Sequence, residues 1–174
     1  MPNKKAAIII AFKDFQDEEY LITKNALEGA GIKVSTASSQ KGIAVGKFGG
    51  EIKIDTVVSG MNIIDFDAVI FIGGPGAVKY FDDKEWQKIA NEAVENKKVL
   101  AAICIAPVIL ARAGVLRGKK ATVWASNMDK SGVKILEEEG AKYFGNPVEI
   151  DGNIITGNGP ESAGRFVQEI LTLL

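Results

Sequence analysis

Histidine is absent from all 174 residues of this sequence, and cysteine occurs once, as Cys104. A cysteine–histidine catalytic pair therefore cannot form within this chain, nor between identical copies of it, because no copy has an imidazole to lend. A single cysteine also excludes a disulfide within the chain, which suits a reducing compartment, and we expect a cytoplasmic location. With no histidine and one thiol, a single chain cannot build a zinc site of the usual ligands, and we expect no metal.

Charge of one sign is not in excess, and long apolar runs are missing. The chain has 21 Lys and Arg against 22 Asp and Glu, a formal net charge of −1. This balance predicts neither a nucleic-acid partner nor an anionic membrane partner.

No apolar stretch approaches the ~20 residues of a membrane span. The opening MPNKKAAIIIAF has a basic start but no cleavage-site pattern, so we interpret it as leading into a first strand rather than as a signal peptide.

Short apolar runs alternate with helical patterns along the chain. The alternation predicts one domain over residues 1–174, an α/β three-layer sandwich on a mainly parallel sheet. Strands are expected at residues 6–12, 33–38, 67–72, 99–103, 121–124, 148–150 and 153–156. Helices are expected at residues 18–30, 82–96, 107–113, 130–139 and 161–173, the first capped by Asp14 or Asp17 and the second by Asp82 and Asp83. Residues 41–58 contain four glycines and predict a small antiparallel excursion.

Cys104 lies at a turn between a predicted strand and a predicted helix. The apolar run 99–103 leads into it, and Pro107, which is tolerated in a first helical turn, begins the helix that follows. Such a turn lies at the carboxyl end of a strand, where sites form in open α/β sheets, and the unpaired N–H groups of a helix end favour a thiolate. An isolated cysteine in an apolar run is more often a core residue, so it is the strand–turn–helix context that favours a nucleophile.

The loop Gly73-Gly74-Pro75-Gly76 also follows a predicted strand. A glycine cluster is most often only a turn. This one lacks both the Lys-Ser/Thr of a phosphate-binding P-loop and the G-x-G-x-x-G spacing, so we do not expect a bound nucleotide. Its glycines could instead let backbone N–H groups approach a reacting carbonyl and stabilise an oxyanion.

Four features, in this order, resemble the DJ-1/PfpI superfamily, whose fold is similar to that of class I glutamine amidotransferases. They are the first strand with an acidic helix start, the loop FIGGPGA, the elbow AICIAP, and the late turn TGNGP before the last helix. The resemblance covers essentially the whole chain. It implies a flavodoxin-like α/β/α sandwich and a homodimer or larger homo-oligomer.

The resemblance also implies roles for individual residues. Cys104 would be the reactive thiol, and the backbone N–H groups of Gly74 and Ile105 would form the oxyanion pocket. The family places a glutamate twelve residues before the glycine that ends the first helix, which is Glu19 here, with Glu18 as the alternative if the register slips by one. A carboxyl group buried against a thiolate should have a raised pKa; protonated, it could donate a hydrogen bond to sulfur, and ionised, it could act as a base.

A pocket around the thiol is implied as well, with Gly73, Pro107, Trp124, Asn158 and Gly159 at or near its walls. Trp124 could simply pack, and the two late-turn residues could only shape the turn. The sequence departs from the family at three positions. Peptidase-like members have histidine where this chain has Ile105, other members have histidine where it has Trp124, and some have arginine where it has Asn158.

These departures leave four hypotheses for the function. The first is a cofactor-free, cysteine-dependent activity of the glyoxalase or deglycase type on a small carbonyl compound. The second is a redox-sensing or chaperone-like stress protein whose Cys104 oxidises to sulfinic acid. The third is a PfpI-type peptidase or amidase acting on peptides, weakened because amide hydrolysis must protonate a poor leaving group; a carboxylate or one of Tyr20, Tyr80 and Tyr143 would have to replace histidine. The fourth is a family member without catalysis.

Overall fold

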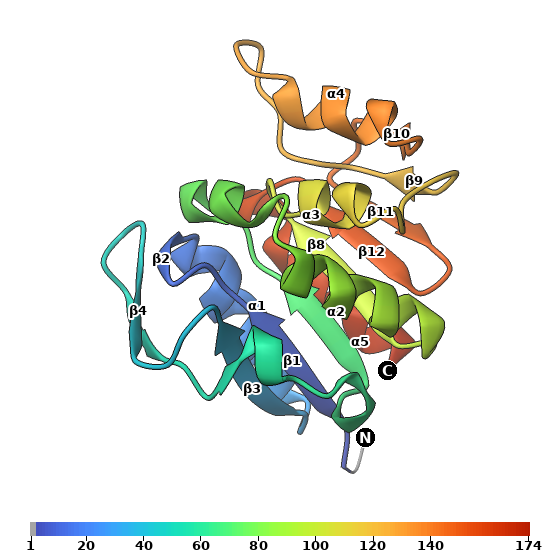
Figure 1. Ribbon diagram of the computed structural model, residues 1–174. Coiled ribbons are helices and arrows are strands. Elements are labelled where there is room, and N and C mark those ends of the chain that lie inside the picture. Colours follow the sequence, from blue (N-terminus) through green and yellow to red (C-terminus); the bar gives the residue numbers. More distant parts are fainter. Residues whose placement is uncertain (1–2) are drawn as a thin grey trace.

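The main sheet of the protein has seven strands in the order β11-β12-β8-β7-β1-β3-β6 (Figure 1). It is seen in a computed structural model that describes residues 3–174. All neighbouring strands run parallel except β11 and β12, which form an antiparallel hairpin. The strands are β1 (Lys5–Ile9), β3 (Lys33–Ser38), β6 (Thr56–Val57), β7 (Ala68–Phe71), β8 (Val99–Ile103), β11 (Val148–Asp151) and β12 (Ile154–Gly157).

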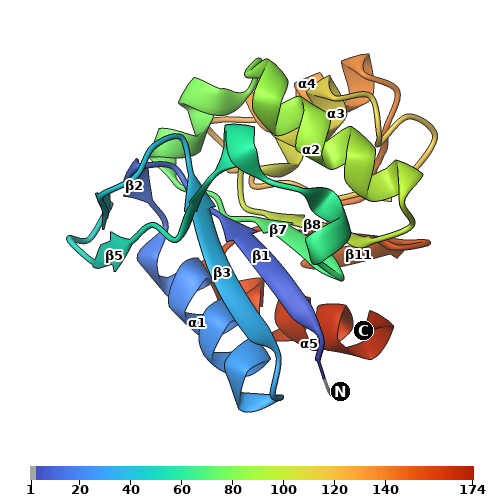
Figure 2. The same ribbon diagram turned by 60° about the horizontal axis from the view of Figure 1, so that its bottom comes forward.

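Helices cover both faces of this sheet, which confirms the predicted three-layer α/β/α sandwich. Helices α1 (Asp17–Gly29) and α5 (Ala163–Leu173) pack together on one face, and α2 (Lys84–Glu95) and α3 (Pro107–Arg112) lie on the other (Figure 2). Helix α4 (Ser131–Glu138) packs on α3. Within residues 3–174, four short 3-10 helices complete the set, at Val58–Gly60, Ile63–Asp65, Pro75–Tyr80 and Pro160–Ser162.

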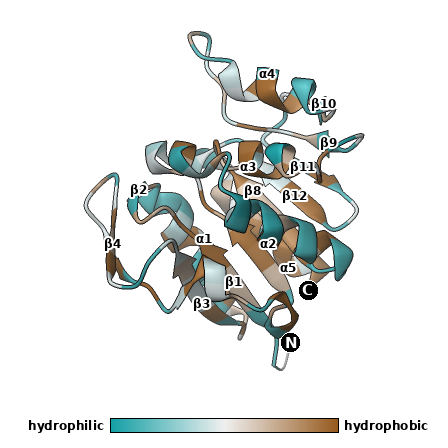
Figure 3. Ribbon diagram, in the orientation of Figure 1, coloured by the Kyte–Doolittle hydropathy of each residue, from teal (hydrophilic) through white to brown (hydrophobic). Residues whose placement is uncertain are grey.

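The central strands are apolar along their whole length because both of their faces are covered. All residues of β7 and β8 are buried, and in β7 Ile70 lies between Ile8 of β1 and Ala101 of β8. Helix α2 is amphipathic: its outer face is hydrophilic, while the strands beneath it are hydrophobic (Figure 3). This two-sided burial is the pattern of a parallel sheet inside an α/β domain. None of the helices in the described part of the chain has the length and apolarity to cross a bilayer.

Helix α1 begins differently from the prediction. Neither Asp14 nor Asp17 is its cap; the side-chain oxygen of Gln16 accepts the N–H groups of Glu18 and Glu19 at 2.7 and 3.2 Å. The physical reason is that Asp17 already belongs to the first turn, and its carboxylate is used elsewhere. For α2 the prediction holds in part, since the cap is Asp83 alone.

The predicted antiparallel excursion is a separate three-stranded sheet. Strand β4 (Ile43–Gly46) pairs antiparallel with β5 (Glu51–Lys53), but it also pairs parallel with β2 (Lys13–Phe15). The end of the predicted segment, β6, joins the edge of the main sheet instead. A short chain segment after β1 thus leaves the main sheet and anchors the excursion beside the start of α1.

The strand expected at residues 121–124 is wrong. Strand β9 is only Lys120–Ala121 and pairs with β10 (Lys142–Tyr143) in a two-stranded sheet. Beyond it, the N–H of Thr122 donates to the hydroxyl of Thr156 and the N–H of Trp124 donates to the carbonyl of Cys104, at 2.9 and 2.7 Å. These groups therefore do not pair in a ladder, and the segment runs past the elbow as a loop.

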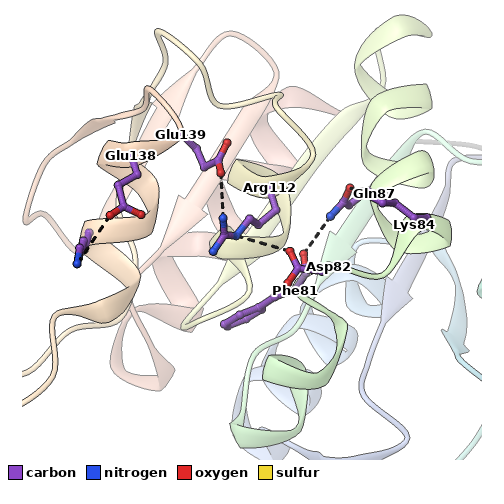
Figure 4. A network of polar contacts seen from close by, with 8 residues as sticks. Phe81, Asp82, Lys84, Gln87, Arg112, Glu138 and Glu139 are labelled. Atoms are coloured by element: carbon purple, nitrogen blue, oxygen red, sulfur yellow. Dashed lines mark hydrogen bonds and ion pairs between the residues drawn. The ribbon is translucent and has the colours of Figure 1, made fainter.

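An arginine ties the peripheral helices to the rest of the sandwich (Figure 4). Arg112 at the end of α3 donates to Glu139, just after α4, at 3.0 Å, and lies 3.7 Å from Asp82, just before α2. The carbonyl of Phe81, next to Asp82, accepts the side-chain amide of Gln87 at 3.1 Å. Partly exposed ion pairs contribute up to about 1 kcal/mol each, so the cluster orients these segments more than it stabilises the fold.

Ile70 offers a test of this core. Ile70→Ala is expected to lower the free energy of unfolding by about 2–5 kcal/mol, because it removes buried methyl groups and leaves a cavity, whereas Ile70→Val should cost about 0.5–1.5 kcal/mol. Urea denaturation measures both, with an unchanged m-value showing that the unfolding transition stays the same. Equal losses in the two variants would contradict a close-packed central strand at this position.

Candidate active site

The predicted site residues meet where β7 and β8 end at the carboxyl edge of the sheet. Cys104 follows β8, the Gly73–Gly76 loop follows β7, and α1 begins beside them. A cleft of about 410 Å³ opens over the thiol. It is lined by Gln16, Lys47, Gly74, Pro75, Val78, Phe81, Cys104, Ile105, Trp124, Asp129, Ser131 and Pro160. This edge is where open α/β sheets bind ligands.

Cys104 has the backbone geometry of a nucleophile elbow. Its φ angle is +63°, in the left-handed region that non-glycine residues rarely adopt. The strain costs on the order of 1–3 kcal/mol and persists only when the surroundings hold it. They do so here from both sides. The N–H of Cys104 donates to the carbonyl of Gly157 at 2.9 Å, and its carbonyl accepts the N–H of Trp124 at 2.7 Å.

The glycine loop approaches the elbow so closely that it has no room for side chains. A Cβ at Gly73 would lie 2.4 Å from the Cβ of Cys104 and 2.8 Å from the carbonyl oxygen of Ile103. Gly74 has a φ of +109°, and a Cβ there would lie 2.5 Å from the backbone nitrogen of Gln16. Glycine at both positions therefore lets the ends of β7 and β8 and the start of α1 converge on one point.

Glu19 is the carboxyl group at this point. Its side chain is fully buried and interacts with the side chain of Cys104, whereas Glu18 is exposed. Oε1 accepts the N–H of Gly73 at 3.0 Å, and Oε2 is buried without a hydrogen-bond partner. Burial raises the pKa of Glu19 from 4.5 to about 8; the Gly73 N–H and the Cys104 side chain oppose the rise, and the charge of Glu18 adds to it.

The pKa of Cys104 is raised as well, to about 12. Burial is the main cause and the negative charge of Glu19 the next, while the N–H groups of Gly74 and Ile105 point at the sulfur and oppose the rise. The expectation of a thiolate favoured by the helix end is therefore wrong. Helix α3 has only six residues, and its N–H groups are outweighed by burial and by the neighbouring carboxylate.

The two side chains titrate as a pair. The charge on Glu19 that raises the pKa of the thiol exists only after the carboxyl has lost its proton, near pH 8. Below that pH both groups are neutral, and above it the pair carries one negative charge. The site therefore holds a thiol beside a carboxyl group that becomes a base in the neutral to mildly alkaline range.

Of the predicted pocket residues, Trp124 lines the cleft with 36% of its surface exposed, together with Gly74 and Ile105. The other four do not line it. Gly73 is covered by Cys104, and Pro107 is buried at the start of α3. The N–H of Asn158 donates to Pro147, and Gly159 lies behind Trp124, where a Cβ would be 3.7 Å from the indole ring. Asn158 and Gly159 thus support the indole from behind, whereas Pro160, at the end of the late turn, borders the cavity.

The prediction missed most of the cleft walls. They come from the cap of α1, the turn after β4, the 3-10 helix Pro75–Tyr80 and the start of α4, which bring in Gln16, Lys47, Val78, Phe81, Asp129 and Ser131. The glycine-flanked excursion was the only sequence signal for any of them. Among residues 3–174, no group of three or more Cys, Asp or Glu side chains is arranged to hold a metal ion.

The chain is similar in sequence to known proteins along its whole length. The model of the DJ-1/PfpI family matches residues 4–173. YraA of Bacillus subtilis, whose name marks it as a candidate cysteine protease, is 34% identical over 99% of this chain and 99% of its own. A protein of Pyrococcus furiosus named deglycase PfpI is 28% identical over 96% of this chain and 98% of its own.

Solved structures share the fold. The crystal structure of a ThiJ/PfpI domain protein from Brachyspira murdochii is 32% identical in sequence and superposes with a TM-score of 0.91, covering 98% of this chain and 95% of that one.

The raised pKa of Glu19 has a consequence for stability. Between about pH 4.5 and pH 8 the carboxyl is ionised in the unfolded chain but protonated in the folded one. The folded state binds more protons in this range, so stability falls as the pH rises, by a total on the order of 5 kcal/mol. Glu19→Gln should remove this pH dependence. Relative to the wild type, the free energy of unfolding of the variant should therefore increase from pH 5 to pH 8, as measured by urea denaturation. Glu18→Gln, at an exposed position, is the control, and a parallel pH dependence in wild type and Glu19→Gln would contradict the raised pKa.

Proposed function

This chain belongs to the DJ-1/PfpI family, and from that premise we propose that it is a cysteine-dependent, cofactor-free enzyme that processes small reactive aldehydes by glyoxalase- or deglycase-type chemistry. One observation carries the proposal. A strained Cys104 faces an open cleft with two N–H donors at its sulfur and a buried carboxyl group, Glu19, as its acid–base partner. Addition to an aldehyde needs only these groups.

The first step is addition of sulfur to the aldehyde carbon. The carboxylate of Glu19 takes the thiol proton as the S–C bond forms, and the π electrons of the carbonyl move onto its oxygen. The N–H groups of Gly74 and Ile105, which point at the sulfur, are positioned to hold that oxygen. An oxyanion donor of this kind contributes about 3 kcal/mol to the transition state. Protonation of the oxygen by Glu19 then gives a hemithioacetal and restores the carboxylate.

The second step rearranges the adduct of a 2-oxoaldehyde. Glu19 removes the proton from the carbon attached to sulfur and returns it to the neighbouring carbonyl carbon, while the hydroxyl proton moves from one oxygen to the other. The product is a thioester of a 2-hydroxy acid. Water hydrolyses the thioester and frees the thiol, so the balance is one aldehyde and one water to one 2-hydroxy acid. No external oxidant or reductant is required.

Peptide hydrolysis receives less support from the site. An amide nitrogen must be protonated as it leaves, and the chain has no histidine to do this. The three tyrosines are not among the residues that line the cleft. The hydroxyl of Tyr20 bonds to Thr36 at 2.7 Å, that of Tyr80 bonds to Ser39 at 3.0 Å, and Tyr143 borders a different, smaller cavity.

A second candidate function is a redox response of Cys104, favoured by its place in the lining of the cleft and by the unpartnered Oε2 of Glu19, which could bond a sulfinate oxygen when protonated. Two molecules of peroxide would convert the thiol to sulfinic acid and release two molecules of water. Intact-mass measurement after mild peroxide treatment tests this, and a Cys104 that stays reduced in excess peroxide would remove the candidate.

The proposed enzyme is tested by clearance of methylglyoxal. We expect Cys104→Ala to abolish turnover and Glu19→Gln to lower it by about 10²–10⁴-fold, because the proton shuttle is lost. Wild-type kcat should rise with pH through about 8, where Glu19 ionises, and Glu19→Gln should lack this inflection. Glu18→Gln is the matched control and should keep both rate and profile. Turnover that survives both site substitutions would contradict the proposal.

A further inference from the structure

We infer that the cleft selects carbonyl compounds that carry an anionic group, a carboxylate or a phosphate, and that Lys47 binds this group. The inference deepens the proposed function, on which it rests for the identity of the substrate. It concerns a wall of the cleft that lies outside the thiol and its carboxyl partner. Three observations support it. The turn that carries Lys47 is anchored to α1, the ammonium group of Lys47 has no anionic partner, and most other polar groups of the cleft are hydrogen-bond donors.

The backbone of the turn that carries Lys47 is held beside the cleft by a side chain from the first turn of α1, while the Lys47 side chain is exposed. The turn after β4 runs over Asp17, whose carboxylate accepts the N–H of Phe48 and the N–H of Gly50, each at 2.8 Å. The backbone N–H of Lys47 itself donates to the carbonyl of Phe15 at 2.8 Å. Glycine is needed on both sides of the turn, because a Cβ at Gly46 or Gly50 would lie 2.3 or 2.6 Å from Asp17.

The ammonium group of Lys47 has no anionic partner. None of the ion pairs among residues 3–174 includes it. Its nearest aromatic neighbour is the exposed ring of Phe48, 5.2 Å from the ammonium nitrogen. A cation over an exposed ring gains little, so the charge remains available to a ligand.

The other polar groups of the cleft are mostly hydrogen-bond donors. Gln16 uses its side-chain oxygen to cap α1, which leaves its amide NH₂ as the free end. The N–H groups of Gly74 and Ile105 point toward the sulfur. The one carboxylate among the lining residues, Asp129, keeps its negative charge, but its Oδ1 is turned to Ser131 and accepts the N–H and the hydroxyl of that residue at 2.9 and 2.6 Å.

A donor-rich cleft with one unpaired cation matches a ligand that is rich in acceptors. A short carbonyl compound with a carboxylate or phosphate at its other end provides an oxygen for the N–H pair and an anion for Lys47. The volume of about 410 Å³ accommodates a molecule of this size. The remaining walls, including Val78, Phe81 and Trp124, are apolar.

Alkylation of Cys104 tests the inference without depending on turnover. Iodoacetate and iodoacetamide differ in charge but not in chemistry, since the sulfur displaces iodide from both. Lys47→Gln is expected to lower the ratio of the iodoacetate rate to the iodoacetamide rate by about threefold to fivefold, the size of a partly exposed charge interaction. In the wild type the same ratio should fall with added salt. Lys53→Gln removes an exposed lysine of β5 outside the cleft lining and should leave the ratio unchanged.

Asp17→Asn keeps Lys47 but weakens the hold on its turn, and it should lower the ratio in the same direction. A purely structural disturbance of the elbow would change both alkylation rates together and leave the ratio intact. A ratio that is the same in wild type, Lys47→Gln and Asp17→Asn would overturn the inference.

Protection of Cys104 from alkylation tests whether the anion that Lys47 binds is part of the carbonyl compound itself. Glyoxylate and methylglyoxal both add reversibly to a thiol, but only glyoxylate is an anion. Lys47→Gln should raise the half-protecting concentration of glyoxylate against iodoacetamide and leave that of methylglyoxal unchanged. Equal effects on both compounds would overturn the inference, whereas a wild type that binds glyoxylate through Lys47 but turns over no 2-oxoaldehyde, neutral or anionic, would count against the proposed function alone.

Discussion

The hydrogen bond from the Gly73 N–H to the buried Glu19 carboxyl is the contact on which the site depends. It joins the end of β7 to the first turn of α1 at the place where Cys104 leaves β8. The contact is possible only because residue 73 has no side chain, since a Cβ would overlap the Cβ of Cys104. The same N–H compensates part of the cost of burying the carboxyl. Three segments far apart in the chain therefore meet within hydrogen-bonding distance.

In the proposed mechanism the acid–base chemistry falls to this carboxyl, because the sequence has no histidine. A histidine titrates near neutrality without help, whereas a carboxyl must be buried to do so. Burial of Glu19 brings its pKa to about 8, but the same apolar surroundings raise the pKa of the thiol. The site thus avoids two adjacent charges. In the proposed reaction, Glu19 therefore takes the thiol proton as sulfur adds to the aldehyde, and the thiol does not lose it beforehand.

The first turn of α1 serves several parts of the cleft at once. Gln16 caps the helix and lines the cavity, Asp17 holds the turn that carries Lys47, and Glu19 faces the thiol. Adjacent positions of a helix point in different directions around its axis, so one acidic turn reaches the small sheet on one side and the elbow on the other. The acidic sequence at this helix start is therefore more than a favourable interaction with the helix dipole.

Local patterns were enough to predict the sandwich. Continuous apolar runs mark strands covered on both faces, and proline, glycine and capping aspartate mark the helix ends, because these signals act within a few residues. Local patterns failed at 121–124 and at the cap of α1. At 121–124 the N–H groups bond to Thr156 and Cys104, which lie outside the segment. At the start of α1 the side chain of Gln16 caps the helix in place of the expected aspartate.

By itself, the sequence determined the parallel sheet, the elbow at Cys104 and the exclusion of a cysteine–histidine pair, since each follows from residue types and their order. The resemblance to a family pointed to Glu19. Only the tertiary structure decided that Glu19 is buried and Glu18 exposed, that the thiol is less acidic than the helix end suggested, and that Lys47 lies at the cleft. The reason is that burial and the meeting of distant segments are properties of the packed chain, which no local pattern records.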